Sequence, residues 1–100
     1  MKELKEHISQ IQRLCDRYNI KALFAFGSVT NDKFNADSDI DLLVDIDIDD
    51  PIEYADNYFG FKFQLQELFN RELDVLEQKA ITNPLLRQKI DQSKVLVYAR

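Results

Sequence analysis

Two apolar stretches joined by a polar segment constrain this chain more than any other part of it. The first ends at Gly27-Ser28, and the second opens on Asp39-Ile40-Asp41. Successive strand side chains point to opposite faces, so Asp39 and Asp41 share one face about 6–7 Å apart while Ile40 points into a core. We therefore expect two neighbouring strands, at about 21–26 and from about residue 39, with paired carboxylates on one surface.

The paired carboxylates and the Gly-Ser turn suit a site for a metal and a nucleoside triphosphate. Mg²⁺ binds through one or two carboxylates plus substrate phosphates, and two ions about 3.5–4 Å apart can share such a pair in phosphoryl transfer. Gly27 lets the backbone approach a phosphate because it lacks a Cβ atom. The Ser28 hydroxyl and the free N–H groups of the turn can donate to phosphate oxygens.

A calcium-binding loop is one alternative for this acidic segment. An EF-hand loop needs Gly at its sixth position and Glu at its twelfth. Counted from Asp37, those positions hold Leu42 and Ile48, so a calcium loop is excluded. The two common glycine-rich phosphate loops are absent as well. A solvated acidic turn is the plainer alternative, but the apolar strands on both sides of the turn favour the metal site.

The segment from Leu23 to Val44 resembles the signature of the DNA polymerase β-like nucleotidyltransferase superfamily, in which an apolar strand ends in Gly-Ser and a spacer leads to Asp-x-Asp on the next strand. The short chain is most similar to the minimal nucleotidyltransferases (MNT), which are commonly antitoxin partners of HEPN-domain toxins. The resemblance extends from Leu23 to about Tyr98. It implies ATP as substrate, a two-metal Mg²⁺ site, and transfer of AMP to a tyrosine of a HEPN-type toxin.

A third acidic residue is implied by this resemblance, on a later strand that faces the first two. The run 71–77 is strand-like, and Asp74 stands in it between two apolar residues, as in the third-carboxylate strand of the superfamily. Glu72 shares that face one step earlier and is the alternative. The resemblance assigns Asp39, Asp41 and Asp74 to metal binding and catalysis, with Asp74 helping to remove the proton from the attacking hydroxyl.

The phosphate contacts are assigned to Gly27, Ser28 and Lys33. Many minimal nucleotidyltransferases carry an Ala-Arg-Gly triplet soon after Gly-Ser, whereas this chain has Thr30-Asn31-Asp32. Lys33 can replace the charge of the missing Arg, but a lysine binds as a point charge and lacks the guanidinium fork. The departure bears on nucleotide affinity more than on the metal site.

The remaining pattern predicts elements in the order α-β-β-α-β-α-β. Apolar residues recur at helical spacing over about 4–18 and 52–70, a short helix follows Pro84, and a final edge strand covers about 95–98. This order predicts an α/β (α+β two-layer) fold, with a small mixed β-sheet packed with helices; by resemblance it is the nucleotidyltransferase fold. One domain over residues 1–100 is expected from the length.

The second strand and the helix after it carry further patterns. Alternation continues to about Asp49, with Leu43 on the face of the aspartates, and Asp50-Pro51 caps the next helix. More distal aspartates read as the solvated end of the strand, since each residue pair lies about 6–7 Å farther from the site. One apolar stripe of the helix is core, while Phe59 and Phe63 belong to a second stripe that is either core or an anchor for a partner.

Composition narrows the class of protein. Of the 18 acidic and 13 basic residues, ten acidic and one basic lie between Asp32 and Asp56, so no basic stripe supports direct nucleic-acid binding. Cys15, the single cysteine, excludes an intramolecular disulfide and argues against structural zinc. The charged N-terminus is no signal peptide and no apolar run reaches membrane-spanning length, so a cytoplasmic protein without membrane contact is expected. Homo- and hetero-oligomers are both open.

Two other functions stay open beside protein modification. The chain can be a docking module of nucleotidyltransferase fold that neutralises its partner without catalysis, and the altered Thr30-Asn31-Asp32 spacer favours that alternative. It can also be a subunit that modifies a small molecule, although such relatives usually add a domain to form the acceptor pocket. The intact Gly27-Ser28 turn and the three candidate carboxylates favour the enzyme.

Overall fold

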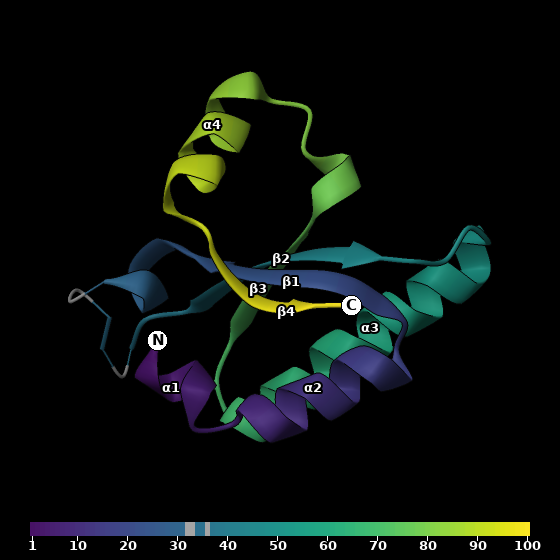
Figure 1. Cartoon of the computed structure of the whole chain (residues 1–100), viewed down its shortest axis with the longest axis horizontal. Coiled ribbons are helices and arrows are strands. Elements are labelled where there is room, and N and C mark those ends of the chain that lie inside the picture. The colour runs from purple at the N-terminus through teal and green to yellow at the C-terminus, as the bar shows by residue number, and fades with distance from the viewer. Residues whose placement is uncertain (32–33, 36) are drawn as a thin grey trace.

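Four strands form one mixed sheet in the order β3-β2-β1-β4 (Figure 1). The computed structural model describes residues 1–31, 34–35 and 37–100. β1 (Ile20–Phe26) runs antiparallel to β2 (Ile40–Ile46) and to β4 (Val95–Ala99), whereas β3 (Leu73–Glu77) runs parallel to β2. A parallel pair needs a crossover connection, and α3 supplies it. The predicted mixed sheet packed with helices is confirmed.

The helices lie on both sides of this sheet. α1 (Lys2–Lys5), α2 (Ile8–Arg17) and α3 (Pro51–Phe69) lie on one side, and α4 (Pro84–Ser93) lies on the other (Figure 1). Among the described residues, the 3₁₀ turn η1 (Gly27–Thr30) follows β1, and the 3₁₀ turn η2 (Gln78–Ala80) follows β3. The layer of α2 and α3 therefore covers one sheet face, and the opposite face is only partly covered.

The hydrophobic core lies between the sheet and the layer of α2 and α3. Strand positions that alternate along β2 supply one side of it, and the inner faces of the helices supply the other. Its members include Ile40, Leu42 and Val44 from β2, Leu23 and Ala25 from β1, Leu73 and Val75 from β3, and Ile11, Cys15, Phe61 and Leu65 from the helices. Within α3, the stripe predicted to be core is thus confirmed.

Local signals fix where the helices begin and end. Asp50 caps α3 by accepting a hydrogen bond from the Glu53 amide at 2.9 Å, with Pro51 at the first helical position. Asn83 caps α4 in the same way. Asn19, after α2, adopts a left-handed φ of 58°, a conformation that asparagine tolerates better than most residues. The predicted cap at Asp50-Pro51 and the predicted end of the first helix near residue 18 are confirmed.

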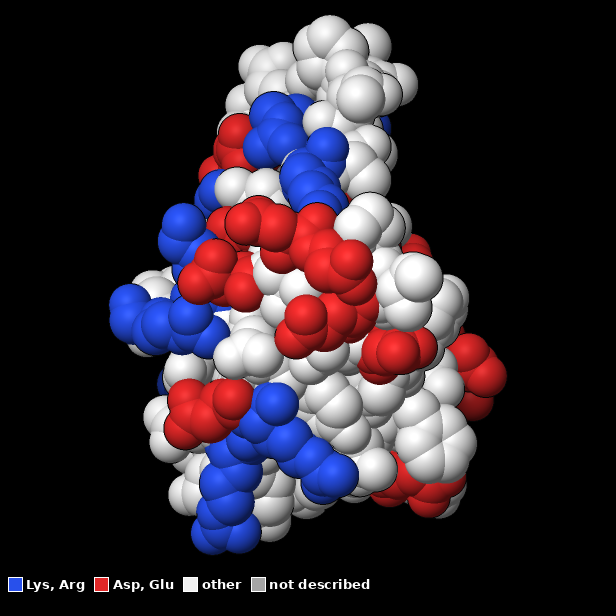
Figure 2. Space-filling view, turned by 90° about the vertical axis from the view of Figure 1, so that its right-hand side faces the viewer, with Lys and Arg blue, Asp and Glu red and all other residues white. Residues whose placement is uncertain are grey.

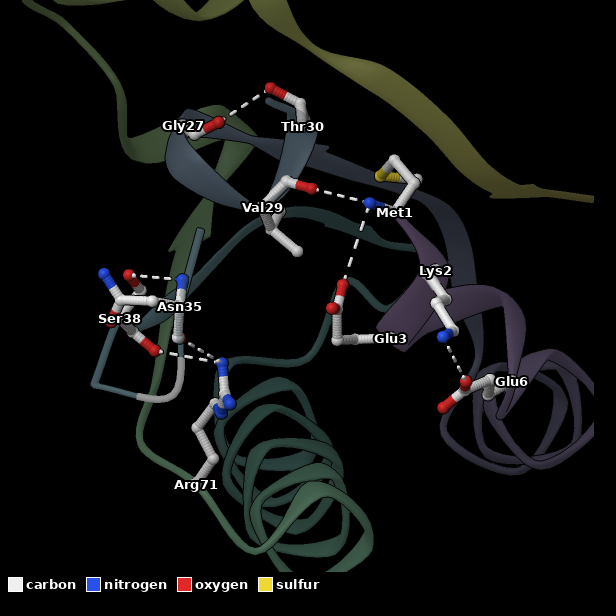
Figure 3. Close-up of polar contacts among 10 residues, drawn as sticks. All are labelled: Met1, Lys2, Glu3, Glu6, Gly27, Val29, Thr30, Asn35, Ser38 and Arg71. Atoms are coloured by element: carbon white, nitrogen blue, oxygen red, sulfur yellow. Dashed lines mark hydrogen bonds and ion pairs between the residues drawn. The ribbon is translucent and has the colours of Figure 1, made fainter. Parts of the chain in front are cut away.

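The single helix predicted over about 4–18 is wrong, because the chain breaks into α1 and α2 at Glu6 and His7. The break turns α1 so that Leu4 is buried at 1 % exposure, while the Met1 amino group donates to the Val29 carbonyl at 2.8 Å (Figure 3). The His7 ring meets the edge of the Phe69 ring at 5.2 Å between centroids. These three contacts stabilise the bend between α1 and α2.

One prediction for β2 is also corrected. The strand ends at Ile46, which pairs with the first residue of β1, Ile20, so no partner strand remains for an extension to Asp49. Leu43 lies on the face of the aspartates, as predicted, and is fully buried there. It pairs with Phe24 and Leu76 on the face of the sheet that α4 and η2 partly cover.

The second stripe of α3 faces solvent. Ile52, Phe59 and Phe63 are 75 %, 65 % and 57 % exposed, so they contribute little to the core of this chain. Of the two alternatives for this stripe, burial in the core is wrong and a partner surface stays a prediction. No helix among the described residues combines the length and apolar character needed to cross a membrane.

Candidate functional site

Asp41 and Asp74 are brought together by the parallel pairing of β2 and β3. The two residues are direct partners in the register, although 33 positions separate them in the chain. Residues in register on adjacent strands project from the same sheet face, which here is the face opposite the main core. Asp41 is half-buried and Asp74 is exposed. The sheet thus places two of the three predicted carboxylates side by side.

Asp39, the remaining predicted carboxylate, lies in the segment directly before β2. The pKa of the Asp41 carboxyl is raised above its usual value, first by burial, then by the negative charge of Asp74, and then by that of Asp39. All three carboxylates therefore share one electrostatic environment. We call Asp39, Asp41 and Asp74 the acid cluster.

The backbone of Gly27 lies against the acid cluster. Its φ of +72° lies in the left-handed region that side chains disfavour, and a Cβ atom at this position would collide with the Asp41 carboxylate. Only glycine lets the turn approach Asp41 in this way. The Gly27 carbonyl accepts a hydrogen bond from the Thr30 hydroxyl at 2.7 Å, which closes η1 (Figure 3).

The acid cluster has no compensating charge among the described residues. No cation and no hydrogen-bond donor in that part of the chain pairs with Asp39, Asp41 or Asp74. Hard carboxylate oxygens of this kind are the donors that Mg²⁺ prefers, so the chemistry of the set fits a divalent ion. As the side chains stand, no group of three or more His, Cys, Asp or Glu over the same residues could hold a metal ion.

The other predicted site residues fall into three groups. Ser28 lies half-buried in η1 beside Gly27, and Lys33 lies outside the described residues. Glu72, the alternative third carboxylate, precedes β3, and its main-chain carbonyl accepts a hydrogen bond from the Ile40 amide at 3.4 Å. Its side chain is exposed. Asp74, inside the strand and in register with Asp41, is better placed than Glu72.

Thr30 and Asn31, the first two residues at the position of the family triplet, bond to the backbone of their own turn, and Asp32 lies outside the described residues. Thr30 donates to the Gly27 carbonyl, and the Asn31 amide nitrogen of the main chain donates to the Ser28 carbonyl at 3.1 Å. Neither residue carries a positive charge. The missing arginine is therefore not replaced by Thr30 or Asn31.

Arg71 is a residue of this region that the sequence analysis did not single out. Its Nη1 donates to the carbonyl of Asn35 and to the carbonyl of Ser38, the residue directly before Asp39 (Figure 3). The signal was present in the register: if Ile40 pairs with Leu73, the residue two before β3 must lie near the residue two before β2. When the parallel pairing is not known, Arg71 has the features of an ordinary polar residue after a helix.

A second acidic region lies away from the acid cluster, at the far end of β2. Asp47, Asp49 and Asp50 are exposed in the connection to α3. Figure 2 views the molecule from this side and shows Asp and Glu side chains gathered at the centre, with Lys and Arg side chains above them, to their left and below them. The negative charge predicted for this part of the chain is thus displayed on the surface.

A mixed sheet that sets a glycine turn against carboxylates on adjacent strands defines a nucleotidyltransferase. The chain belongs to the family described as "Polymerase beta, Nucleotidyltransferase", whose model matches residues 9–100. It is similar to a protein of Methanocaldococcus jannaschii named "Putative protein adenylyltransferase MJ1379", with 24 % identity over 98 residues. The matched region covers 97 % of this chain and 97 % of that protein.

Solved structures share the fold. A structure described as a "putative minimal nucleotidyltransferase" superposes with a TM-score of 0.76 at 23 % identity, covering 94 % of this chain and 92 % of that one. A second is described as a tri-AMPylated HEPN toxin of Shewanella oneidensis in complex with MNT antitoxin. It has a TM-score of 0.66 at 16 % identity and covers 97 % of this chain and 73 % of that one. The predicted family and fold are confirmed.

Proposed function

We propose that this chain transfers AMP from ATP to a tyrosine hydroxyl of a HEPN-type toxin and acts as its antitoxin. The observation that carries the proposal is the acid cluster, whose charge no described residue compensates and which the Gly27 turn approaches closely. The name of the Methanocaldococcus jannaschii relative and the AMPylated toxin in the Shewanella oneidensis complex support the choice of AMP and of a protein acceptor.

Asp39, Asp41 and Asp74 are the residues that would hold divalent metal, with Mg²⁺ the ion that their oxygens suit. When bound, such ions neutralise phosphate charge and orient the triphosphate for in-line displacement. Gly27 and Ser28 would contact the triphosphate, with the glycine turn giving the phosphates room to lie against the sheet. The role of the protein is chiefly to position the reactants and to stabilise the charge that develops, since no covalent intermediate with the protein is needed.

The proposed reaction is a displacement at the α-phosphorus of ATP. The tyrosine oxygen of the partner forms a bond to the α-phosphorus of ATP, and the bond from that phosphorus to the bridging oxygen of the β-phosphate breaks. Pyrophosphate leaves with the electron pair. Asp74, exposed at the rim of the acid cluster, accepts the tyrosine proton. Its place on the edge strand leaves it accessible to a folded partner.

The decisive assay incubates the protein with ATP labelled at the α-phosphate, Mg²⁺ and the HEPN-type protein encoded beside it. Label is expected on a tyrosine of that partner, and Asp41→Asn should abolish the transfer, whereas Asp56→Asn, an exposed position on α3, should not. Transfer that survives Asp74→Ala but not Glu72→Ala would assign the third carboxylate to Glu72. Label that stays off the partner while wild type still binds nucleotide would overturn the proposed acceptor.

Docking without catalysis is the second candidate, and the turn at Thr30 favours it. Thr30 bonds to its own turn and supplies no cation, so the hold on the triphosphate lacks the arginine found in many relatives. This candidate predicts that toxicity of the partner is neutralised equally by wild type and by Asp39→Ala/Asp41→Ala. The enzymatic proposal predicts that the double variant fails to neutralise.

A further inference from the structure

Asn35, Asp37 and Ser38, which we call the turn before Asp39, are held together by hydrogen bonds. The Ser38 amide donates to the Asn35 carbonyl at 3.1 Å, and the Asn35 amide donates to the Ser38 hydroxyl at 3.1 Å. The Asp37 amide donates to the Asn35 side-chain oxygen at 2.8 Å. Because Asp39 follows Ser38 directly, the shape of this turn decides how Asp39 enters the site.

Arg71 clamps this turn from the other side of the parallel pair. Its Nη1 donates to the Asn35 carbonyl at 3.3 Å and to the Ser38 carbonyl at 3.2 Å (Figure 3). Its guanidinium carbon stands 4.6 Å from the centroid of the Phe34 ring. A half-buried arginine that binds two carbonyls and packs on an aromatic ring is held in one orientation.

The Ser38 carbonyl is chemically joined to the Asp39 amide. Both belong to one planar peptide group, so the hydrogen bond from Arg71 fixes the plane from which the Asp39 backbone departs. One residue after Arg71, the Glu72 carbonyl accepts from the Ile40 amide at 3.4 Å. Arg71 and Glu72 therefore grip the chain on the two sides of Asp39, once through a side chain and once through the backbone.

We infer that Arg71 is a positioning residue, which aims the Asp39 carboxylate at Asp41 and Asp74 by fixing the peptide group between Ser38 and Asp39. The inference rests on the proposed function of the acid cluster as a metal site. Supporting residues that orient metal ligands commonly change metal affinity or activity by about 10–100-fold when they are removed. The same range is expected here for metal affinity, while the nucleotide contacts at Gly27 and Ser28 stay in place.

The chain offers a matched control in Arg87. Its Nη2 donates to the carbonyls of Gln78 and Ile81 at 2.7 and 3.3 Å. It is thus a second arginine that clamps two main-chain carbonyls, but it joins α4 to η2 and has no bond to the turn before Asp39. Arg87→Ala removes the same kind of clamp without touching Asp39.

The experiment titrates the purified full chain with Mn²⁺ in the presence of α,β-methylene ATP and follows bound metal by electron paramagnetic resonance. Arg71→Ala is expected to raise the Mn²⁺ concentration for half-saturation by about tenfold or more, while the KM for ATP at saturating metal changes less than about threefold. Arg71→Lys restores the charge without the fork, so it should recover part of the loss. Arg87→Ala should bind Mn²⁺ as wild type does.

The outcomes separate the two ideas. If wild type binds Mn²⁺, Asp41→Asn does not, and Arg71→Ala matches Arg87→Ala, the positioning role is overturned and the metal site stands. If wild type binds no Mn²⁺, both the metal site and the positioning role fall. Should Arg71→Ala not fold, Arg71→Lys keeps the test open, because wild-type Mn²⁺ affinity in that variant overturns the inference.

Discussion

Replacing Asp41 by Asn should stabilise the metal-free protein while it destroys activity. In the folded chain this carboxylate is half-buried and faces Asp74 across the parallel pair, with Asp39 nearby. No described donor or cation offsets the repulsion. The asparagine side chain has the same shape, carries no charge, and can donate to a neighbouring carboxylate. The site therefore carries an electrostatic cost that the substitution removes.

The size of the effect follows from the pairing. Cross-strand charged neighbours change stability by roughly 0.2–1 kcal/mol, and the partial exposure of both side chains keeps the value away from the upper end. We expect a gain of about 0.5 kcal/mol in the free energy of unfolding. For a domain of this size, 1 kcal/mol corresponds to roughly 4–8 °C in Tm, so the expected rise is about 2–4 °C.

The pH dependence has a defined sign. The folded state raises the pKa of Asp41 above its usual 3.8, so it binds that proton more tightly than the unfolded state does. Wild type therefore gains stability as the pH falls through the folded-state pKa toward 3.8, and it lacks this gain at neutral pH. The advantage of Asp41→Asn should be largest near pH 7 and should shrink as the pH falls.

Urea unfolding of wild type, Asp41→Asn and the control Asp56→Asn at several pH values measures these differences. The control should stay within about 0.5 kcal/mol of wild type at every pH. Saturating Mg²⁺ with an ATP analogue should reverse the order, since a ligand at 100 times its Kd stabilises the folded state by about 2.7 kcal/mol. An Asp41→Asn variant that is less stable than wild type without metal at pH 7 would refute the reasoning.

Three further perturbations test other parts of the structure. Gly27→Ala should lower stability by at least about 1–2 kcal/mol, the cost of a left-handed non-glycine residue, and should abolish transfer because its Cβ meets the acid cluster. Phe59→Asp with Phe63→Asp should change the free energy of unfolding by less than about 1 kcal/mol, since both side chains face solvent, and it should weaken binding of the HEPN-type partner if this stripe is the anchor. Burial raises the pKa of the Cys15 thiol to about 12, so labelling by a thiol reagent at pH 8 should require unfolding and proceed at the rate of the opening reaction.

Each of these has a control and a contrary result. Phe61→Ala, at a fully buried position of the same helix, should cost about 3–5 kcal/mol, and a comparable loss in the double Phe variant would contradict the exposure of the stripe. Wild-type transfer by Gly27→Ala would show that the turn does not need its close approach to Asp41. Rapid labelling of Cys15 in the folded protein would contradict its burial.

Local signals predicted the elements around the site well. The alternation that buries Ile40, Leu42 and Val44 leaves Asp41 on the other face, and this follows from strand geometry alone. The Asp50-Pro51 cap is equally local. The third strand was identified because Asp74 sits between two apolar residues, whereas its pairing with Asp41 is known only from the parallel register of the structure.

What the sequence could not supply depends on contacts between distant residues. The alternation places Leu43 on the face of the aspartates, but its burial is known only once α4, which begins more than 40 residues later, is seen to lie on that side of the sheet. The bend at His7 depends on a ring that α3 provides, Phe69. Arg71 acquires its role only when the β2–β3 register is known. Periodicity reports which face a residue takes, and it is silent about what will cover that face.

The position of β3 at the edge of the sheet has a consequence for when the site exists at all. β3 has one neighbouring strand, β2, and the Tyr58 hydroxyl of α3 bonds to its Val75 carbonyl. Edge segments open locally at lower free energy than the centre of a domain, so separating Asp74 from Asp41 would leave β1 and β2 paired, at the cost of the core contacts of Leu73 and Val75. A ligand that bridged the two carboxylates would hold the strand in place, and a partner strand that paired with the free edge would stabilise it as well. Ligand binding and docking at that edge would then be thermodynamically linked, each favouring the other.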